Sequence, residues 1–347
     1  MLTTPTDYEI RTRPCPECYL CGTKGQLVYQ GLQDRLFGAP GTWDVKRCPG
    51  PACGLTWLDP MPLQEDLWKA YKQYYTHESS KGTQIRTERR IGVLEAGYLA
   101  LQYGYFNTCG NNWKKIVGSL MYLMPSIKSN IDSGVMYLPA KTMGLLLDVG
   151  CGNGEAMEYL QRVGWGVEGI DLDPVAIELA RSRGLHAHVG SLGTQRFSAE
   201  HFDAITLSHV LEHVPDPISF LGDCLRILKP GGTIIVSTPN IESLGHKAYT
   251  GHWRGLEPPR HLYIFSHASL QYVAERTGFK VVRIMTTNHW VHGIIAESIK
   301  AVRRRTNADS RNYIDKIIIR TFSCVEILGM FMGLNWGEEL VMIGRKR

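Results

Sequence analysis

Segments typical of strands alternate with segments typical of helices between residues 144 and 290, and this alternation limits the fold more than any other feature of the sequence. Such an alternation is typical of a parallel sheet in which helices connect successive strands. The sequence therefore predicts an α/β fold. The strand-like segments are 144–150, 166–172, 202–208, 233–240, 279–287 and, at the end of the chain, 339–347.

Three capping signals locate helices between these strands. Asp173 and Asp216 each precede a proline, and a capping aspartate followed by a proline is typical of a helix start. Ser266 is a similar cap, for a helix that we expect to run to about Gly278. The helix that begins after Asp216 is expected to continue through residues 226–232.

The rest of the chain divides into regions of different composition. Residues 1–60 are rich in Cys, Pro and Gly, and a compact unit of this kind needs a staple such as a metal ion. Residues 61–143 carry aromatic and basic residues in mixed helical patterns, which predicts a helical linker or cap. Residues 144–347 are expected to form the α/β domain, with a helical insertion at about 291–337.

A glycine-rich turn follows the first strand of this domain. Gly150, Gly152 and Gly154 let the backbone turn tightly and approach a ligand closely. Asp171 ends the next strand, where a carboxylate can accept hydrogen bonds from both ribose hydroxyls of a nucleoside. The spacing is G-x-G-x-G rather than that of a dinucleotide site, and Asp148 precedes the turn. A carboxylate there would repel a phosphate but suits a cation, so we expect S-adenosylmethionine (SAM) at this turn.

Five segments resemble the successive motifs of class I SAM-dependent methyltransferases: LDVGCGNG, GIDLDPVAIELA, FDAITLSHVLEHVPDP, LRILKPGGTIIVSTPN and PPRHLYIFSHASLQYVAERTGF. The resemblance covers roughly residues 144–290. It implies a Rossmann-like sheet of strand order 3-2-1-4-5-7-6 with an antiparallel last strand. It also implies that Gly190–Leu192 lies beside the adenine and that His209 borders the methyl donor. The residues expected to contact SAM are Asp148, Gly150, Cys151, Gly152, Gly154, Asp171, Leu172, Ser191, Leu192 and His209.

Five of the nine cysteines lie between residues 15 and 53. Cys18-x2-Cys21-Gly and Cys48-x4-Cys53-Gly form two pairs, and four thiolates in two turns match a closed tetrahedral zinc site. Cys15 offers a competing pair with Cys18, and a scatter of buried thiols is the alternative. The region resembles the small zinc ribbon that precedes the catalytic domain in several bacterial methyltransferases of sugar-modifying and polysaccharide-cluster type. That resemblance implies structural Zn²⁺.

Candidate catalytic residues follow the strand 202–208. His209, Glu212 and His213 are spaced i, i+3 and i+4, so they share one face of a helical turn. Histidine is the natural base near neutral pH for a hydroxyl acceptor. The pattern also resembles the Glu-x-x-Glu-His metal motif of ubiquinone-pathway and small-RNA O-methyltransferases, with the first ligand changed to His. A catalytic role, a divalent metal and a structural turn therefore all stay open.

The loop 253–263 follows the fifth strand and is expected at the ligand-binding edge of the sheet. It contains His261, the second candidate for the catalytic base. It also contains Arg254 and Arg260, whose forked guanidinium groups suit a phosphate or carboxylate. Scattered exposed charge is the alternative interpretation.

The sequence predicts a SAM-dependent methyltransferase, and the resemblance implies a sugar hydroxyl on a nucleotide sugar or lipid-linked glycan as acceptor. A C- or N-methyltransferase of a small metabolite and a non-catalytic zinc-ribbon binding protein are the alternatives. The net charge of +5 does not favour nucleic acid as a partner. The polar first residues predict a cytoplasmic protein. Arg303–Arg305 and the apolar stretch Ile317–Leu334 suit peripheral contact with the inner face of a membrane, and a helical cap over the active site is the alternative.

Overall fold

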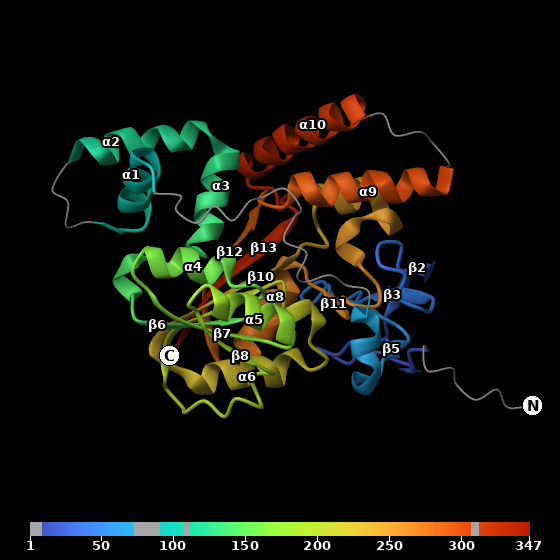
Figure 1. The fold of residues 1–347 in the computed structure, drawn as a ribbon. Coiled ribbons are helices and arrows are strands. Elements are labelled where there is room, and N and C mark those ends of the chain that lie inside the picture. The colour runs from blue at the N-terminus through green and yellow to red at the C-terminus, as the bar shows by residue number, and fades with distance from the viewer. Residues whose placement is uncertain (1–8, 73–90, 107–111, 307–311) are drawn as a thin grey trace, which may run out of the picture.

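A seven-stranded mixed sheet lies at the centre of the protein in this computed structural model (Figure 1). Its order is β12-β13-β10-β9-β6-β7-β8, and β13 runs antiparallel to both of its neighbours. Counted along the chain within this sheet and read from β8 to β12, the order is 3-2-1-4-5-7-6. The α/β class is confirmed. The strands are β6 (Leu145–Val149), β7 (Gly166–Asp171), β8 (His186–Val189), β9 (Phe202–Ser208), β10 (Leu228–Pro239), β12 (Phe279–Thr287) and β13 (Glu339–Lys346).

The structure describes residues 9–72, 91–106, 112–306 and 312–347. Parts of the expected N-terminal module, helical segment and insertion therefore lie outside the described residues, as do the side chains of Arg304 and Arg305. No helix among the described residues has the length and apolar character that crossing a membrane requires.

Three helices of the α/β domain begin at the expected caps, Asp173, Asp216 and Ser266. The Asp173 carboxylate accepts a hydrogen bond from the backbone N–H of Val175 at 2.9 Å. Asp216 accepts one from Ser219 at 3.0 Å. These bonds satisfy backbone donors that have no partner within the first helical turn. The helices are α4 (Glu155–Arg162), α5 (Pro174–Ser182), α6 (Pro217–Ile227), α7 (Leu244–Tyr249) and α8 (His267–Arg276).

The helix α6 is shorter than the sequence suggested. It ends at Ile227, and β10 begins at Leu228, so the expected continuation through residues 226–232 was wrong. Pro230 has no backbone N–H and disfavours a helical backbone at the residue before it. The segment after Ile227 is therefore extended.

A four-stranded sheet combines N-terminal strands with one strand from the α/β domain. β11 pairs antiparallel with β4, so that Tyr263 lies opposite Trp57. Leu55, Trp57, Leu262 and Phe265 are buried in the same hydrophobic cluster as residues of the large sheet. The N-terminal module and the α/β domain thus share one core. The strands are β2 (Gln26–Leu32), β3 (Trp43–Arg47), β4 (Thr56–Leu58) and β11 (Tyr263–Ile264), and the short strands β1 (Thr12–Arg13) and β5 (Met61–Pro62) form a separate pair.

Additional helices gather on one side of the large sheet, at the top of Figure 1. Three of them precede the sheet in the chain, and α9 and α10 lie between β12 and β13, within the segment expected to be an insertion. The helices are α1 (Val93–Gln102), α2 (Asn112–Ser119), α3 (Pro125–Gly134), α9 (Val291–Thr306) and α10 (Asn312–Phe331). Short 3-10 helices are η1 (Gln64–Tyr71), η2 (Leu120–Leu123), η3 (Ala140–Thr142), η4 (Leu211–His213), η5 (Thr250–His252) and η6 (Arg254–Leu256).

Arg260 is a buried cation that joins three distant segments. Its Nη1 donates to Asp34 Oδ2 at 2.8 Å and to the backbone oxygen of Ala70 at 3.0 Å. Its Nε donates to Glu257 Oε1 at 2.7 Å. Burial opposes the charge, but the two carboxylates raise the pKa of Arg260 above its usual value. The network therefore fixes the segment around Arg260 against the N-terminal module.

We expect Arg260→Ala to lower the free energy of unfolding by about 3–5 kcal/mol, because it removes the buried cation that pairs with the carboxylates of both Asp34 and Glu257. Urea unfolding followed by circular dichroism measures the change. Arg183→Ala is the control, since Arg183 lies 3.8 Å from Glu155 and from Glu158 near the surface. Loss of such a pair costs less than about 1 kcal/mol. Equal effects of the two substitutions would contradict the importance given to the buried network.

Candidate functional site

The glycine turn after β6 leaves open space above Gly152. The φ angles of Gly150, Gly152 and Gly154 are 75°, 52° and 83°, which favour glycine. The N–H groups of Gly150 and Cys151 donate to the oxygen of Ile170 at 2.8 and 3.1 Å and anchor the turn to β7. A Cβ atom at Gly152 would meet nothing within 4 Å. A ligand can therefore approach this backbone closely.

Asp171 is oriented by the same turn. Its Oδ2 accepts a hydrogen bond from Gly152 N, and its Oδ1 accepts one from Asp173 N, both at 2.9 Å. Each carboxylate oxygen keeps a further lone pair for another donor. The carboxylate can therefore accept two ribose hydroxyls while it holds the turn.

The other residues expected beside the cofactor differ in exposure. Leu172 is 75% exposed, and Ser191 is also exposed, with its N–H donating to Thr194 Oγ1 at 3.0 Å. Leu192 and Cys151 are buried in hydrophobic clusters. Of these four residues, Leu172 and Ser191 are therefore the two that are exposed at the surface.

Asp148 is buried beneath the glycine turn. Its Oδ1 accepts a hydrogen bond from Thr206 Oγ1 at 2.7 Å. Burial raises the pKa of Asp148 to about 7, and the nearby Asp171 adds to this shift. Near neutral pH the carboxyl group therefore exists in both forms, and a cation bound above the turn would favour the ionised form.

His209 follows β9 with a φ of 53° and lies between two buried carboxylates. Its Nδ1 is 3.2 Å from Glu212 Oε1, and its Nε2 is 3.0 Å from Glu339 Oε1. Burial alone would lower the pKa of His209, but the two carboxylates raise it. In turn His209 lowers the pKa of Glu212, against the effect of burial. The imidazole is therefore positively charged near neutral pH and is not suited to accept a proton.

Glu212, His213 and His261 lie together, with their ligand atoms within 4.8 Å of one another. His213 Nδ1 is 3.0 Å from the oxygen of Arg260, and His261 Nδ1 is 2.7 Å from the oxygen of Gly255. An Nδ1–H that donates to a backbone carbonyl leaves Nε2 free to accept. The same arrangement is typical of histidines that bind metal ions.

The protonation state of His261 also suits a ring that accepts a proton or binds a metal ion. Burial lowers the pKa of His261 to about 4, so the ring is neutral near neutral pH. A neutral imidazole can accept a proton or bind a metal ion. With Glu212 and His213 it could hold a divalent cation, so the structure brings together three of the four candidate catalytic residues around one point. The fourth, His209, touches this group through Glu212.

The arginines of the loop 253–263 pair with carboxylates of the protein itself. Arg260 is buried against Asp34 and Glu257, and Arg254 pairs with Glu257. Trp253 is buried as well, and its Nε1 donates to a buried glutamate. The expectation of a forked guanidinium group for an anionic acceptor was therefore wrong for Arg260, which is fully buried. Arg254 is partly exposed beside Glu257, so for this residue the expectation stays a prediction. The loop uses its charges to fix its own conformation.

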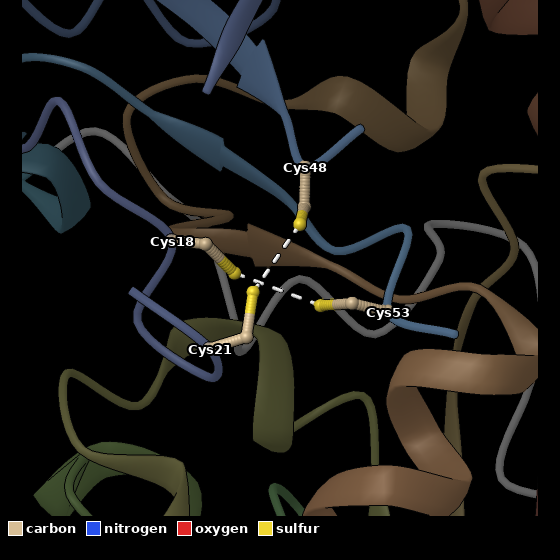
Figure 2. Close-up of side chains that lie close together, drawn as sticks. All are labelled: Cys18, Cys21, Cys48 and Cys53. Atoms are coloured by element: carbon tan, nitrogen blue, oxygen red, sulfur yellow. Dashed lines mark hydrogen bonds between the residues drawn. The ribbon is translucent and has the colours of Figure 1, made fainter. Parts of the chain in front are cut away.

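Four cysteines form a compact cluster in the N-terminal module. The sulfur atoms of Cys18 and Cys53 are 3.6 Å apart, and those of Cys21 and Cys48 are 3.4 Å apart. Figure 2 shows the four thiol groups pointing toward one another. A tetrahedral zinc ion with bonds of about 2.3 Å separates its sulfur ligands by about 3.8 Å, close to these distances. Cys15 lies outside the cluster.

Several residues that complete the site were not expected from the sequence. Thr206 holds Asp148, Glu339 holds His209, and the hydroxyl of Tyr71 lies 3.0 Å from His213 Nδ1. A signal existed for Glu339, because an antiparallel last strand begins at the edge where the parallel strands end. The short spacing patterns contain no signal for Tyr71, which comes from a distant segment.

Residues 127–284 match a family model described as a methyltransferase domain. Among similar curated proteins is the ubiquinone biosynthesis O-methyltransferase of Xanthomonas oryzae pv. oryzae, 42% identical over 102 residues, which are 27% of this chain and 43% of that protein. The protein of the same name from Alkalilimnicola ehrlichii is 41% identical over 103 residues, 27% of this chain and 41% of that protein. The chain thus spans about two fifths of the length of these relatives.

A solved structure of a SAM-dependent methyltransferase from Mesorhizobium loti is similar with a TM-score of 0.44 and 16% identity, covering 63% of this chain and 98% of that one. The family match and the glycine turn support an enzyme of the methyltransferase class with SAM as its cofactor. Residues 127–284 are thus similar to a methyltransferase domain, in agreement with the resemblance seen in the sequence.

The buried Asp148 predicts a pH-dependent affinity for SAM. Because the pKa of Asp148 is about 7 and the cationic cofactor favours the ionised form, SAM affinity should rise with pH up to about 7 and then level off. Isothermal titration calorimetry between about pH 5.5 and pH 7.5 measures this, since the carboxyl titrates in that window. Asp148→Asn should bind SAM more weakly and lose the dependence. A flat profile in the unchanged protein would show that Asp148 does not respond to the cofactor.

Proposed function

We propose that this chain transfers the methyl group of SAM to a sugar hydroxyl, on a nucleotide sugar or a lipid-linked glycan. The observation that carries the proposal is the cluster of Glu212, His213 and His261, in which both imidazoles have Nδ1 against a backbone carbonyl. A hydroxyl acceptor must lose a proton as it is methylated, and this cluster offers Nε2 atoms that can accept it. The cluster adjoins His209 at the end of β9, close to the expected position of the methyl donor.

Two further observations support the chemistry and the acceptor. The relatives matched over about a quarter of the chain are named as O-methyltransferases, which supports an oxygen acceptor. The sugar rests on the resemblance of the cysteine module to those of sugar-modifying methyltransferases. In this mechanism SAM supplies the activated methyl group, and the protein aligns the acceptor oxygen and removes its proton.

His213 is the preferred base of the two histidines. Its side chain is only partly buried, whereas His261 is 5% exposed and so has less access to an acceptor. Glu212 lies against both imidazoles and can stabilise the one that becomes protonated. If a divalent cation binds instead, the same three residues are its ligands, and the cation would polarise the acceptor hydroxyl.

The function is tested with SAM labelled in its methyl group and a panel of acceptors. The panel contains nucleotide sugars, lipid-linked glycans and small metabolites with amine or activated carbon acceptors. Label transferred to a sugar oxygen supports the proposal. Transfer of the label only to nitrogen or carbon favours the alternative of an N- or C-methyltransferase of a small metabolite. SAM binding without transfer to any acceptor favours the alternative of a non-catalytic protein.

We expect His213→Ala to lower turnover by about 10²–10⁴-fold with little change in SAM affinity, because the cofactor is held by the glycine turn and Asp171. Steady-state kinetics with the true acceptor and calorimetry with SAM measure the two quantities. His201→Ala removes an exposed histidine away from the cluster and should leave both unchanged. Loss of turnover with a chelator, restored by a divalent ion, would assign a ligand role to the histidine. Near-normal turnover of His213→Ala and of His261→Ala would exclude base catalysis by histidine.

We also propose that Cys18, Cys21, Cys48 and Cys53 bind one structural zinc ion. Their sulfur distances fit a tetrahedral ion, and three of the four side chains are buried. Three buried thiols and one exposed thiol that converge without forming a disulfide are otherwise unusual in so small a sheet. Zinc binding would add its free energy to the folding of the module.

Cys18→Ser combined with Cys21→Ser should lose the zinc and lower the melting temperature, because the binding free energy of the metal contributes to folding. Elemental analysis and differential scanning calorimetry measure these effects. Cys15→Ser is the matched control and should keep one zinc per chain. Protein purified without chelators that contains no zinc would contradict the proposal.

We also propose that the helical side of the molecule makes peripheral contact with a membrane. Tyr313 and Phe331 on α10 and Leu123 after α2 are 77%, 81% and 79% exposed. Lys316 and Arg320 are exposed on α10, and such a mixture of apolar and basic side chains suits an anionic lipid surface. This supports the lipid-linked form of the acceptor, which the acceptor panel compares directly with water-soluble forms.

A further inference from the structure

Glu168, His186 and His188 form a second cluster of metal-ligand side chains, outside the methyltransferase site. Glu168 lies on β7, and both histidines lie on β8, the strand at one edge of the large sheet. Glu168 pairs with His186 in the parallel ladder, and strand residues two apart point to the same face. All three side chains therefore project from the same face of the sheet.

The distances in this cluster are too long for hydrogen bonds and close to those around a metal ion. Glu168 Oε2 is 3.7 Å from His186 Nδ1 and 3.6 Å from His188 Nε2. Hydrogen bonds between such atoms measure about 2.7–3.2 Å. A tetrahedral ion with bonds of about 2.0–2.1 Å to nitrogen and oxygen separates its ligands by about 3.4 Å. All three ligand atoms lie within 4.8 Å of one another, so small side-chain rotations would close the site.

His188 carries a nitrogen that the protein leaves unsatisfied. Its Nε2 atom is buried and has no hydrogen-bond partner in the part of the chain that the structure describes. Buried polar atoms normally find a partner, since an unmade hydrogen bond is costly. The nitrogen faces the Glu168 carboxylate, and an ion between the two would satisfy both. The ring of His186 is 68% exposed, so this ligand can rotate and the site is open to solvent.

We propose that Glu168, His186 and His188 bind a divalent transition-metal ion such as Zn²⁺ or Ni²⁺, with water completing the coordination. Two imidazoles and one carboxylate suit these ions better than Mg²⁺ or Ca²⁺, which prefer oxygen ligands alone. The bound ion links β8 to β7 and so secures the edge of the sheet. The site directly precedes Gly190–Leu192 in the chain, the segment expected beside the adenine. Metal binding at this site does not depend on the reaction proposed above.

Calorimetric titration with Ni²⁺ tests the site in the full-length protein. His186→Ala combined with His188→Ala should lose one equivalent of bound Ni²⁺, or bind it at least tenfold more weakly than the unchanged protein. The cysteine cluster and the Glu212 cluster are present in both proteins, so only the difference between them reports on this site. His201→Ala, which removes another exposed histidine outside the cluster, should bind Ni²⁺ as the unchanged protein does.

Glu168→Gln is a second variant that keeps both imidazoles and the size of the third side chain. It should weaken Ni²⁺ binding severalfold, because it removes the charged ligand. The melting temperature without metal and the SAM affinity verify that each variant is folded. Equal Ni²⁺ stoichiometry and affinity in the unchanged protein and the double histidine variant would overturn the site. Unchanged binding in folded Glu168→Gln would overturn the three-ligand arrangement.

Discussion

Arg260 carries a positive charge inside the protein, and the geometry of the candidate active site depends on how that charge is neutralised. Its partners are Glu257 in the same loop and Asp34 in the N-terminal module. The backbone oxygen of Arg260 lies 3.0 Å from Nδ1 of His213, and the next residue is His261. The ion pairs therefore hold the backbone that orients both imidazoles. Since a buried charge without a partner is strongly unfavourable, this loop has little freedom to adopt another conformation.

Local patterns in the sequence predicted much of the α/β domain because each strand and helix there is specified by its own residues. Buried apolar runs form β6 and β9, and Asp173 and Asp216 cap helices as expected. The end of α6 was missed because the cap at Asp216 indicates where the helix begins but not where it ends, and the effect of Pro230 on the preceding backbone was not applied. The strand β11 could not be predicted, since its two residues become a strand only by pairing with β4.

The sequence predicted those parts of the candidate site for which the residue type and its position at the end of a strand are enough to identify the role. Asp171 and the glycine turn meet because two adjacent parallel strands end beside each other. The residues that hold these site residues in place were missed because they come from distant parts of the sequence, as Glu339 does in its contact with His209. Arg260 was misread for a related reason: a sequence does not reveal whether a charge has an internal partner. Asp34, 226 positions from Arg260, is that partner.

Because β4 pairs with β11, the cysteine module is not a separate unit that can be exchanged without affecting the α/β domain. Ser266 Oγ donates to the oxygen of Cys53 at 3.1 Å, and Leu58 N donates to the oxygen of Leu262 at 3.1 Å. A chain cut back to the residues of the methyltransferase family match would expose β11 as an unpaired edge and remove the cover of Leu262. Replacement of the module would therefore also remove contacts from the loop that carries His261. In this protein the two parts share one core and are to be engineered as one folding unit.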